Sequence, residues 1–196
     1  MAYESVNPFD NKLNKSFAEI SDKELEAKLA TASACYETWR HKSYAERGVI
    51  VARAAALLHE QADKFARIMT SEMGKRIGEA RGETEFSANI LAYYAKNAER
   101  FLANVKLHPT LGDGHMESSP IGVVFCVEPW NFPYYQLARV AGPHLMAGNV
   151  LVVKHAGCVP QCAIAFEKLL LDAGAPDGLY TNLLISQSYA RMWVTA

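Results

Sequence analysis

The hydrophobic periodicity of the sequence changes at Pro120, and this change constrains the fold more than any other feature. Beyond it, apolar runs alternate with helix-length segments in the order strand 121–127, helix 133–147, strand 150–153, helix 160–173 and strand 179–185. This order predicts an α/β fold with a parallel sheet and helical crossovers, which is half of a doubly wound sheet. The nearly continuous apolar run at 121–127 predicts a strand that is covered on both faces.

The first 104 residues carry helical patterns instead of strand patterns. Ser21 and Ser43 each precede a glutamate by three residues, the spacing of a capping box, and apolar residues at helical spacing follow both. Gly74 stands where a helix commonly ends, and a longer helix is expected from about residue 77 to 102. We therefore expect residues 1–104 to form a helical N-terminal part of the molecule.

Residues 105–119 separate the helical part from the sheet pattern. Two short strand-like pieces around a Leu-Gly-Asp-Gly turn predict a hairpin. One interpretation is an oligomerisation segment that pairs with a neighbour's sheet edge, and the other is a loop on the same subunit. Gly112-Asp113-Gly114 also comes nearest to the glycine fingerprint of dinucleotide sites, but the third glycine and the following helix are missing.

Charge and hydropathy argue against several classes of function. Charged residues make up 21% of the 196 residues, the formal net charge is −1, and basic residues are interleaved with acidic ones. This pattern argues against nucleic acid as a partner. No apolar stretch approaches the ~18 residues of a membrane span, so no membrane association is expected. The start of the chain lacks the pattern of a secretory signal, and a cytoplasmic location is therefore expected.

The four cysteines do not form a metal-binding pattern. Only Cys158 and Cys162 are close in sequence, and a zinc site would need two more ligands at suitable spacing, so no metal is expected. Cys35, Cys126 and Cys162 are expected as reduced thiols in or near a core. Cys158 falls in a predicted loop, where the alternative is an incidental reactive thiol.

Polar residues stand where two predicted strands end: Pro129-Trp130-Asn131 after the first and Lys154-His155-Ala156 after the second. Carboxyl ends of parallel strands share an edge where ligands bind, so the Asn131 amide and the Lys154 ammonium are expected to face one crevice. Asn131 can stabilise an oxyanion without a titrating charge, and Lys154 can bind ribose hydroxyls or a phosphate. Trp130 can form an apolar wall. The alternatives are a solvated surface lysine and a turn asparagine.

Several motifs, taken in order, carry a resemblance over about residues 7–185. They are Pro-Ile-Gly-Val-Val, Glu-Pro-Trp-Asn-Phe-Pro, Gly-Pro-His-Leu-Met-Ala-Gly-Asn, Val-Val-Lys-His-Ala and Ala-Gly-Ala-Pro-Asp-Gly-Leu-Tyr, with Glu-Met-Gly-Lys upstream. The series resembles the aldehyde dehydrogenase superfamily, with Arg76 where that family usually has proline. The Lys-His-Ala form, with Val-Pro-Gln-Cys-Ala after it, is most similar to the branch of NAD(P)-dependent succinate-semialdehyde dehydrogenases.

The resemblance implies a Rossmann-like cofactor-binding portion over residues 120–185 and assigns site residues within it. Asn131 matches the family's oxyanion-stabilising asparagine, the one catalytic residue expected in this sequence. The cofactor-contacting residues implied by the resemblance are Trp130, Asn131, Lys154, His155, Ala156 and Gly157. Lys154 would hold the adenosine ribose. Gly157 stands where many NAD-preferring relatives have a ribose-binding glutamate, so the cofactor is NAD or NADP; the alternative is a permissive loop glycine.

In the family, a cysteine thiolate attacks the aldehyde, hydride passes to the nicotinamide, and a glutamate activates water to release the carboxylic acid. The resemblance places that cysteine and that glutamate downstream of this sequence, whose residues 186–196 diverge from the family pattern. A truncated aldehyde dehydrogenase is therefore expected, with a small aldehyde such as succinate semialdehyde as substrate. The alternative is an inactive remnant that acts as a nucleotide-binding or interaction module. The full-length family implies a homo-oligomer, and an unpaired last strand predicts poor solubility for the isolated chain.

Overall fold

A computed structural model describes residues 3–187 and 189–190, so residues 188 and 191–196 of the divergent tail lie outside the described residues. In the first half of the chain the elements are β1 (Tyr3–Val6), β2 (Leu13–Phe17), α1 (Asp22–Trp39), α2 (Tyr44–Glu60), α3 (Ala62–Met73) and α4 (Ile77–Phe101). In the second half they are β3 (Val105–Leu107), β4 (Gly114–Met116), β5 (Val123–Glu128), α5 (Pro133–Ala147), β6 (Val150–His155), α6 (Pro160–Asp172) and β7 (Tyr180–Asn182).

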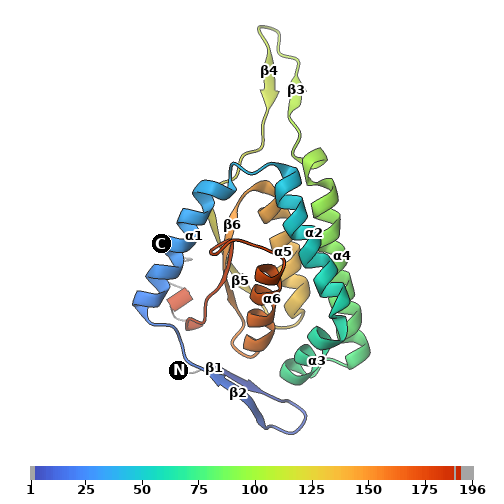
Figure 1. Cartoon of the computed structure of the whole chain (residues 1–196), viewed down its shortest axis with the longest axis vertical. Helices are drawn as coiled ribbons and strands as arrows, with labels where there is room; N and C mark the ends of the chain where they lie inside the picture. The colour runs from blue at the N-terminus through green and yellow to red at the C-terminus, as the bar shows by residue number, and fades with distance from the viewer. Residues whose placement is uncertain (1–2, 188, 191–196) are drawn as a thin grey trace.

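A parallel three-stranded sheet in the order β5-β6-β7 lies at the centre of the molecule. The register pairs Val123 with Val150 and Glu128 with His155, so β5 and β6 begin and end together. In Figure 1, α1 lies on one side of these strands and α5 and α6 on the other, while α2 and α4 pack outside α5 and α6. The strand–helix–strand–helix–strand order predicted from the sequence is confirmed, with helices on both sides of the sheet.

Local sequence accounts for where several helices begin and end. The hydroxyls of Ser21 and Ser43 each accept a hydrogen bond from the backbone N–H three residues on, and the glutamates at those positions return a bond to the cap, so both capping boxes are confirmed. The cap after α3 is Gly74 at φ 73°, and the cap after α5 is Gly148 at φ 97°. L side chains rarely adopt this left-handed conformation, and glycine adopts it without steric cost.

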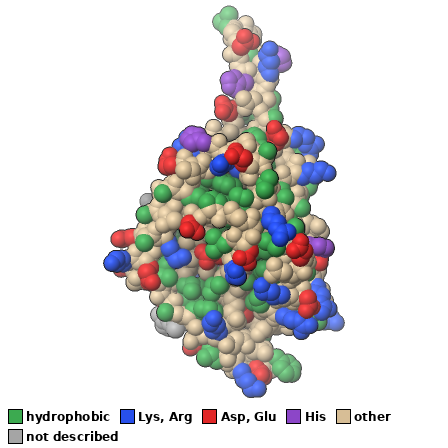
Figure 2. Space-filling model, viewed as in Figure 1, with side chains coloured by type: hydrophobic (Ala, Val, Ile, Leu, Met, Phe, Trp, Pro, Cys, Tyr) green, Lys and Arg blue, Asp and Glu red, His purple; other side chains and the backbone are tan. Residues whose placement is uncertain are grey.

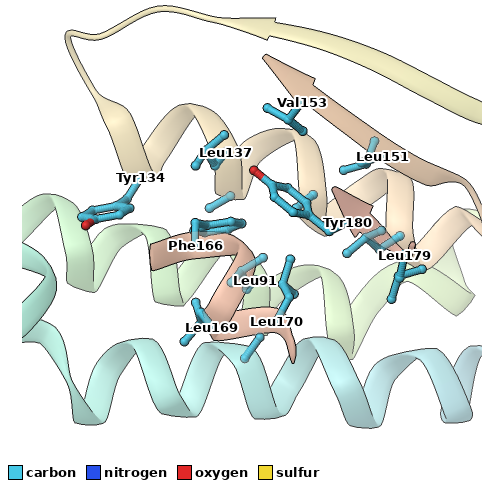
Figure 3. Close-up of a cluster of buried hydrophobic side chains, with 14 of the residues drawn as sticks. Leu91, Tyr134, Leu137, Leu151, Val153, Phe166, Leu169, Leu170, Leu179 and Tyr180 are labelled. Carbon is cyan, nitrogen blue, oxygen red and sulfur yellow. The ribbon is translucent and has the colours of Figure 1, made fainter. Parts of the chain in front are cut away.

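Apolar side chains fill the space between the sheet and the helices on the α5 and α6 side. Figure 3 shows Leu151 and Val153 of β6 above Phe166 of α6, with Leu91 of α4 beyond. The rings of Phe166 and Tyr180 lie with their centroids 5.4 Å apart. All six residues of β6 are buried. The middle strand is therefore the one that is covered on both faces.

Two strand predictions need correction. Val123 and Val127 of β5 are 37% and 52% exposed, so the expectation of a strand covered on both faces is wrong. Within the described residues β5 is an edge strand that pairs with β6 alone. An apolar run shows that a strand can be buried on both faces, but it does not show that other elements cover both faces. The strand expected at 179–185 is limited to Tyr180–Asn182, although the flanking Leu179 and Leu183 are buried.

Strands β3 and β4 form the hairpin expected within residues 105–119, and they pair Val105 with Met116 in antiparallel register. The hairpin extends from the body of the molecule beyond the end of α4 (Figure 1), and Figure 2 shows it as a narrow arm. Its apolar residues Leu107, Leu111 and Met116 are exposed. No helix within the described ranges combines the length and apolar character that a bilayer crossing requires.

Candidate functional site

The carboxyl ends of β5 and β6 bring the two predicted polar segments to one edge of the sheet. Because Glu128 pairs with His155, Trp130 and Asn131 emerge beside the residues that follow β6. Trp130 is 53% exposed and Asn131 is also exposed. Gly157, two residues beyond the end of β6, is exposed as well. This is the edge where parallel α/β sheets bind their ligands.

Lys154 lies inside β6 and not after it, which corrects the strand end expected at residue 153. Its side chain is buried, and its Nζ donates to the His155 carbonyl oxygen at 2.8 Å. The Tyr3 ring of β1 lies 5.5 Å from this ammonium, and a Cβ added at Gly157 would meet the same ring at 3.7 Å. Burial lowers the pKa of Lys154. The lysine therefore belongs to the shared edge and lies beneath Tyr3 of the N-terminal hairpin.

His155 joins the end of β6 to the start of α5. Its Nδ1 accepts a hydrogen bond from the Ala156 backbone N–H at 2.8 Å, so Nε2 carries the proton and donates to the Pro133 carbonyl oxygen at 3.0 Å. Only 2% of the side chain is exposed, and burial lowers the pKa of His155 to about 4. A neutral imidazole thus fixes the two segments relative to each other. Ala156 is half-buried beside it.

The segment that carries Asn131 is held by Lys75 and Glu83, two residues that sequence reasoning did not assign to the site. The Lys75 ammonium donates to the Asn131 carbonyl oxygen at 3.0 Å and forms an ion pair with Glu83. One oxygen of Glu83 accepts from the backbone N–H groups of Tyr134 and Tyr135, at 3.0 and 3.2 Å. The Glu-Met-Gly-Lys motif pointed to this region, but the pattern alone did not say what its lysine contacts.

A pocket of about 550 Å³ opens beside the Asn131 segment. Its walls are Lys75, Glu79, Gly82, Glu83, Phe86, Phe132 and Tyr135. The rings of Phe86 and Tyr135 stack with their centroids 5.5 Å apart, and Phe132 meets Tyr135 edge-on at 6.0 Å. Arg139, one turn further along α5, places its guanidinium 5.7 Å from the Tyr135 ring. The pocket therefore combines aromatic walls with a cation nearby.

None of the four cysteines has an activated thiol. Cys35, Cys126 and Cys162 are buried, as predicted, and Cys158 is exposed in the loop after β6. Burial raises the pKa of all four thiols, to about 12 for Cys126. None of these four cysteines therefore has the lowered pKa that is typical of a nucleophilic cysteine.

The parallel sheet, with polar residues gathered at its carboxyl edge, has the architecture of α/β proteins, a class that binds ligands at the strand ends. The model of the "Aldehyde dehydrogenase family" matches residues 1–191. The chain belongs to this family, as its motifs led us to expect.

Within this family, the chain is similar to several succinate-semialdehyde dehydrogenases. The chain is 38% identical over 183 residues to a succinate-semialdehyde dehydrogenase [NADP(+)] of Deinococcus radiodurans, covering 93% of this chain and 38% of that protein. It is 38% identical over 190 residues to a probable succinate-semialdehyde dehydrogenase [NADP(+)] of Synechocystis, covering 97% of this chain and 42% of that protein. The crystal structure of succinic semialdehyde dehydrogenase from Streptococcus pyogenes in complex with NADP⁺ matches at a TM-score of 0.95 and 38% identity, over 100% of this chain and 43% of that one. The chain thus spans well under half the length of these relatives.

Proposed function

We propose that this chain is the N-terminal, cofactor-binding portion of an NADP-preferring aldehyde dehydrogenase that oxidises succinate semialdehyde to the dicarboxylic acid. The observation that carries the proposal is the paired register of β5 and β6, which aligns the Asn131 segment with Lys154 and Gly157 at one sheet edge. The similar succinate-semialdehyde dehydrogenases, which are described as NADP⁺ enzymes, support the cofactor and the substrate.

The residues of the edge fit a nicotinamide dinucleotide. Lys154 has an ammonium that is poorly solvated, and one hydrogen bond to a carbonyl leaves it further N–H groups to donate to a ribose hydroxyl. Trp130 offers an exposed flat side chain at the neighbouring strand end. Gly157 supplies no carboxylate, so a 2′-phosphate beside it meets no repulsion and the edge admits NADP as well as NAD. His155 and Ala156 set the geometry of the turn.

Asn131 is the catalytic residue that this portion contributes. Its side-chain N–H₂ is a neutral donor for the oxyanion that develops when a thiolate adds to an aldehyde carbonyl. A bound nicotinamide cofactor would accept the hydride that the former aldehyde carbon releases. The thiolate and the base that activates water come from the part of a longer protein that the relatives possess beyond this match, in agreement with the raised pKa of every cysteine here.

The aromatic pocket beside Asn131 is the proposed entry for the aldehyde chain. Lys75 in its wall is already paired with Glu83, so its charge is not available to a substrate. The guanidinium of Arg139 lies over the Tyr135 ring and makes a long hydrogen bond to Gln136, at 3.5 Å. Since guanidinium matches carboxylate geometry, Arg139 is the group we assign to the far carboxylate of succinate semialdehyde.

The second candidate function is a nucleotide-binding or interaction module without turnover. The absence of an activated thiol among the four cysteines favours it for the chain acting alone. The projecting β3–β4 hairpin offers exposed apolar residues for pairing with a second subunit, and we propose a homo-oligomer on that basis.

Calorimetric titration of the purified chain with NADP⁺ and NAD⁺, followed by an assay for reduced cofactor with succinate semialdehyde, tests these proposals. We expect NADP⁺ to bind, affinity to fall about tenfold or more in Lys154→Met through loss of a charge-assisted hydrogen bond, and no turnover. Lys168→Met, an exposed lysine on α6, is the matched control. Absence of binding by either cofactor would refute the cofactor site. Turnover by the chain would show that a residue present here serves as the nucleophile.

A further inference from the structure

The N-terminus of α5 has no local capping side chain. Phe132 occupies the cap position, no side chain of the neighbouring residues bonds to it, and Pro133 begins the helix. Because proline has no backbone N–H, Tyr134 and Tyr135 provide the first N–H groups of this terminus. Both point to one oxygen of Glu83 on α4, at 3.0 and 3.2 Å. A carboxylate with 3% of its side chain exposed thus closes this end of the helix.

Lys75 completes the arrangement from the loop between α3 and α4. Its ammonium pairs with the second oxygen of Glu83 and donates to the Asn131 carbonyl at 3.0 Å. The same nitrogen lies 3.9 Å from the centre of the Phe132 ring, and 10% of the side chain is exposed. Lys75 therefore binds the backbone carbonyl of Asn131, and Glu83 binds the backbone N–H groups three and four residues further along the chain.

We propose that Lys75 and Glu83 are positioning residues that fix the direction of the Asn131 side-chain amide through the main chain of residues 131–135. An oxyanion donor works only when it is held in place before charge develops, and a loop between a strand and a helix needs an anchor to provide this. The charge pair is largely withdrawn from water, so each partner depends on the other: removal of either leaves a buried charge unpaired. This inference rests on the oxyanion role proposed for Asn131.

A comparison within the same molecule separates positioning from simple helix capping. Glu72 closes the N-terminus of α6 in the same manner, accepting from the backbone N–H groups of Gln161 and Cys162 at 2.9 and 2.8 Å. No lysine pairs with Glu72 among the described ion pairs, and its helix does not carry Asn131. Glu72→Gln is therefore the matched control for loss of a capping carboxylate.

The test is nuclear magnetic resonance on the ¹⁵N-labelled chain, observing the side-chain N–H₂ signals of Asn131 and the hydrogen exchange of the Tyr134 and Tyr135 amides. In Glu83→Gln we expect these amides to exchange about tenfold faster, since hydrogen bonds to charged groups contribute roughly 1–1.5 kcal/mol more than those to neutral acceptors. In Lys75→Met we expect the Asn131 signals to shift or broaden. Lys75→Arg, which keeps the charge and the donors, should restore them.

Two further variants keep the outcome decisive if a buried unpaired charge prevents folding. The double variant Lys75→Met with Glu83→Gln is neutral and retains an acceptor for α5, yet it lacks the donor to Asn131, so the Asn131 signals should still move. In Glu83→Ala, added acetate should slow exchange of the Tyr134 and Tyr135 amides again by occupying the vacated site.

The proposal is overturned if the Asn131 signals in the double variant match those of the wild type, or if Glu72→Gln moves them as much. Failure of the proposed function has another signature: NADP⁺ would then leave the Trp130 and Asn131 signals of the wild type unchanged, whatever the Lys75 and Glu83 variants show.

Discussion

At the scale of single residues, burial changes the protonation behaviour of neighbours at the sheet edge in opposite directions. Burial lowers the pKa of His155 from 6.5 to about 4, so the folded protein holds it neutral. Burial raises the pKa of Glu128 from 4.5 to about 7, and the nearby Arg139 offsets part of that rise. The two groups lie opposite each other in the β5–β6 register, and their effects on stability overlap between about pH 4.5 and 6.5.

We predict that His155 makes the protein less stable in acid. Between about pH 6.5 and 4 the unfolded chain protonates this histidine while the folded chain does not, so the free energy of unfolding falls as the pH falls. The contribution reaches about 3 kcal/mol. Urea denaturation of wild type and His155→Gln across this range should show a shallower pH slope for the variant. His41→Gln controls for loss of a surface histidine; equal slopes in wild type and His155→Gln would contradict the prediction.

We predict that Glu128 changes the free energy of unfolding with pH in the direction opposite to His155. Between about pH 4.5 and 7 the folded carboxyl keeps a proton that the unfolded chain has lost, so its stabilising contribution is complete below 4.5 and is lost as the pH rises toward 7. The Glu128→Gln variant should therefore remain more stable than wild type near neutral pH and lose that advantage near pH 4.5. An advantage that persists unchanged at both pH values would rule out titration of Glu128 as the cause.

Gly157 is predicted to set the preference between the two cofactors. A carboxylate introduced by Gly157→Glu beside the proposed 2′-phosphate should weaken NADP⁺ binding about tenfold or more and leave NAD⁺ binding less affected, because like charges repel at close range. Gly157→Gln has a side chain of the same length without the charge and serves as the control. Calorimetric titration gives both affinities; equal losses for the two cofactors would place the 2′-phosphate elsewhere.

At the scale of elements, two ways of ending a helix coexist in this molecule. The N-termini of α1 and α2 are capped by Ser21 and Ser43, three residues from their partners. Those of α5 and α6 are capped by Glu83 and Glu72, which lie 51 and 89 residues from the N–H groups they bind. Local caps form as soon as the turn forms, whereas the distant caps require the packed helices. The second kind occurs at the edge of the sheet where the proposed site lies.

Loss of a local cap should have a moderate and separable effect on stability. We expect Ser21→Ala and Ser43→Ala each to lower the free energy of unfolding by about 1 kcal/mol, because an N–H of the first turn loses its acceptor. Ser33→Ala, at an exposed position inside α1, is the control and should change stability by less. Chemical denaturation measures all three; no difference between Ser33→Ala and the cap variants would show that the capping bonds add nothing.

At the scale of the whole molecule, apolar groups remain exposed at an edge strand and on the arm. Val123 and Val127 of β5 are partly exposed, and Leu107, Leu111 and Met116 project with the hairpin. An edge strand with apolar side chains is a template for pairing with another chain. These surfaces suit burial against more polypeptide, whether from a second copy or from a longer protein.

We predict that the isolated chain associates as its concentration rises. Val127→Lys places a charge on the exposed part of β5 and should shift the equilibrium toward monomer, because a charged edge resists pairing. Sedimentation velocity over a concentration series measures the shift. Val49→Lys, a change at an apolar residue that is 70% exposed on α2, is the control. A wild-type chain that stays monomeric at every concentration would sink this prediction.

Much of the framework could be predicted from sequence because its causes are local. Serine–glutamate spacing located two helix starts, Gly74 located a helix end, and the change of period at Pro120 predicted the parallel strands. The segments 129–131 and 154–156 were also predicted to reach one edge, since parallel strands share their carboxyl ends. Their roles toward cofactor and substrate remain predictions.

The sequence by itself determined the order of helices and strands, the helix boundaries and the meeting of the two polar segments, because each depends on residues a few positions apart or on a general rule for parallel sheets. Only the tertiary structure decided that Lys154 is buried beneath Tyr3, that β5 is exposed, and that Glu83 and Lys75 hold the Asn131 segment. Such contacts join residues far apart in the chain, and the packing that makes them leaves no periodic signal in the sequence around either residue.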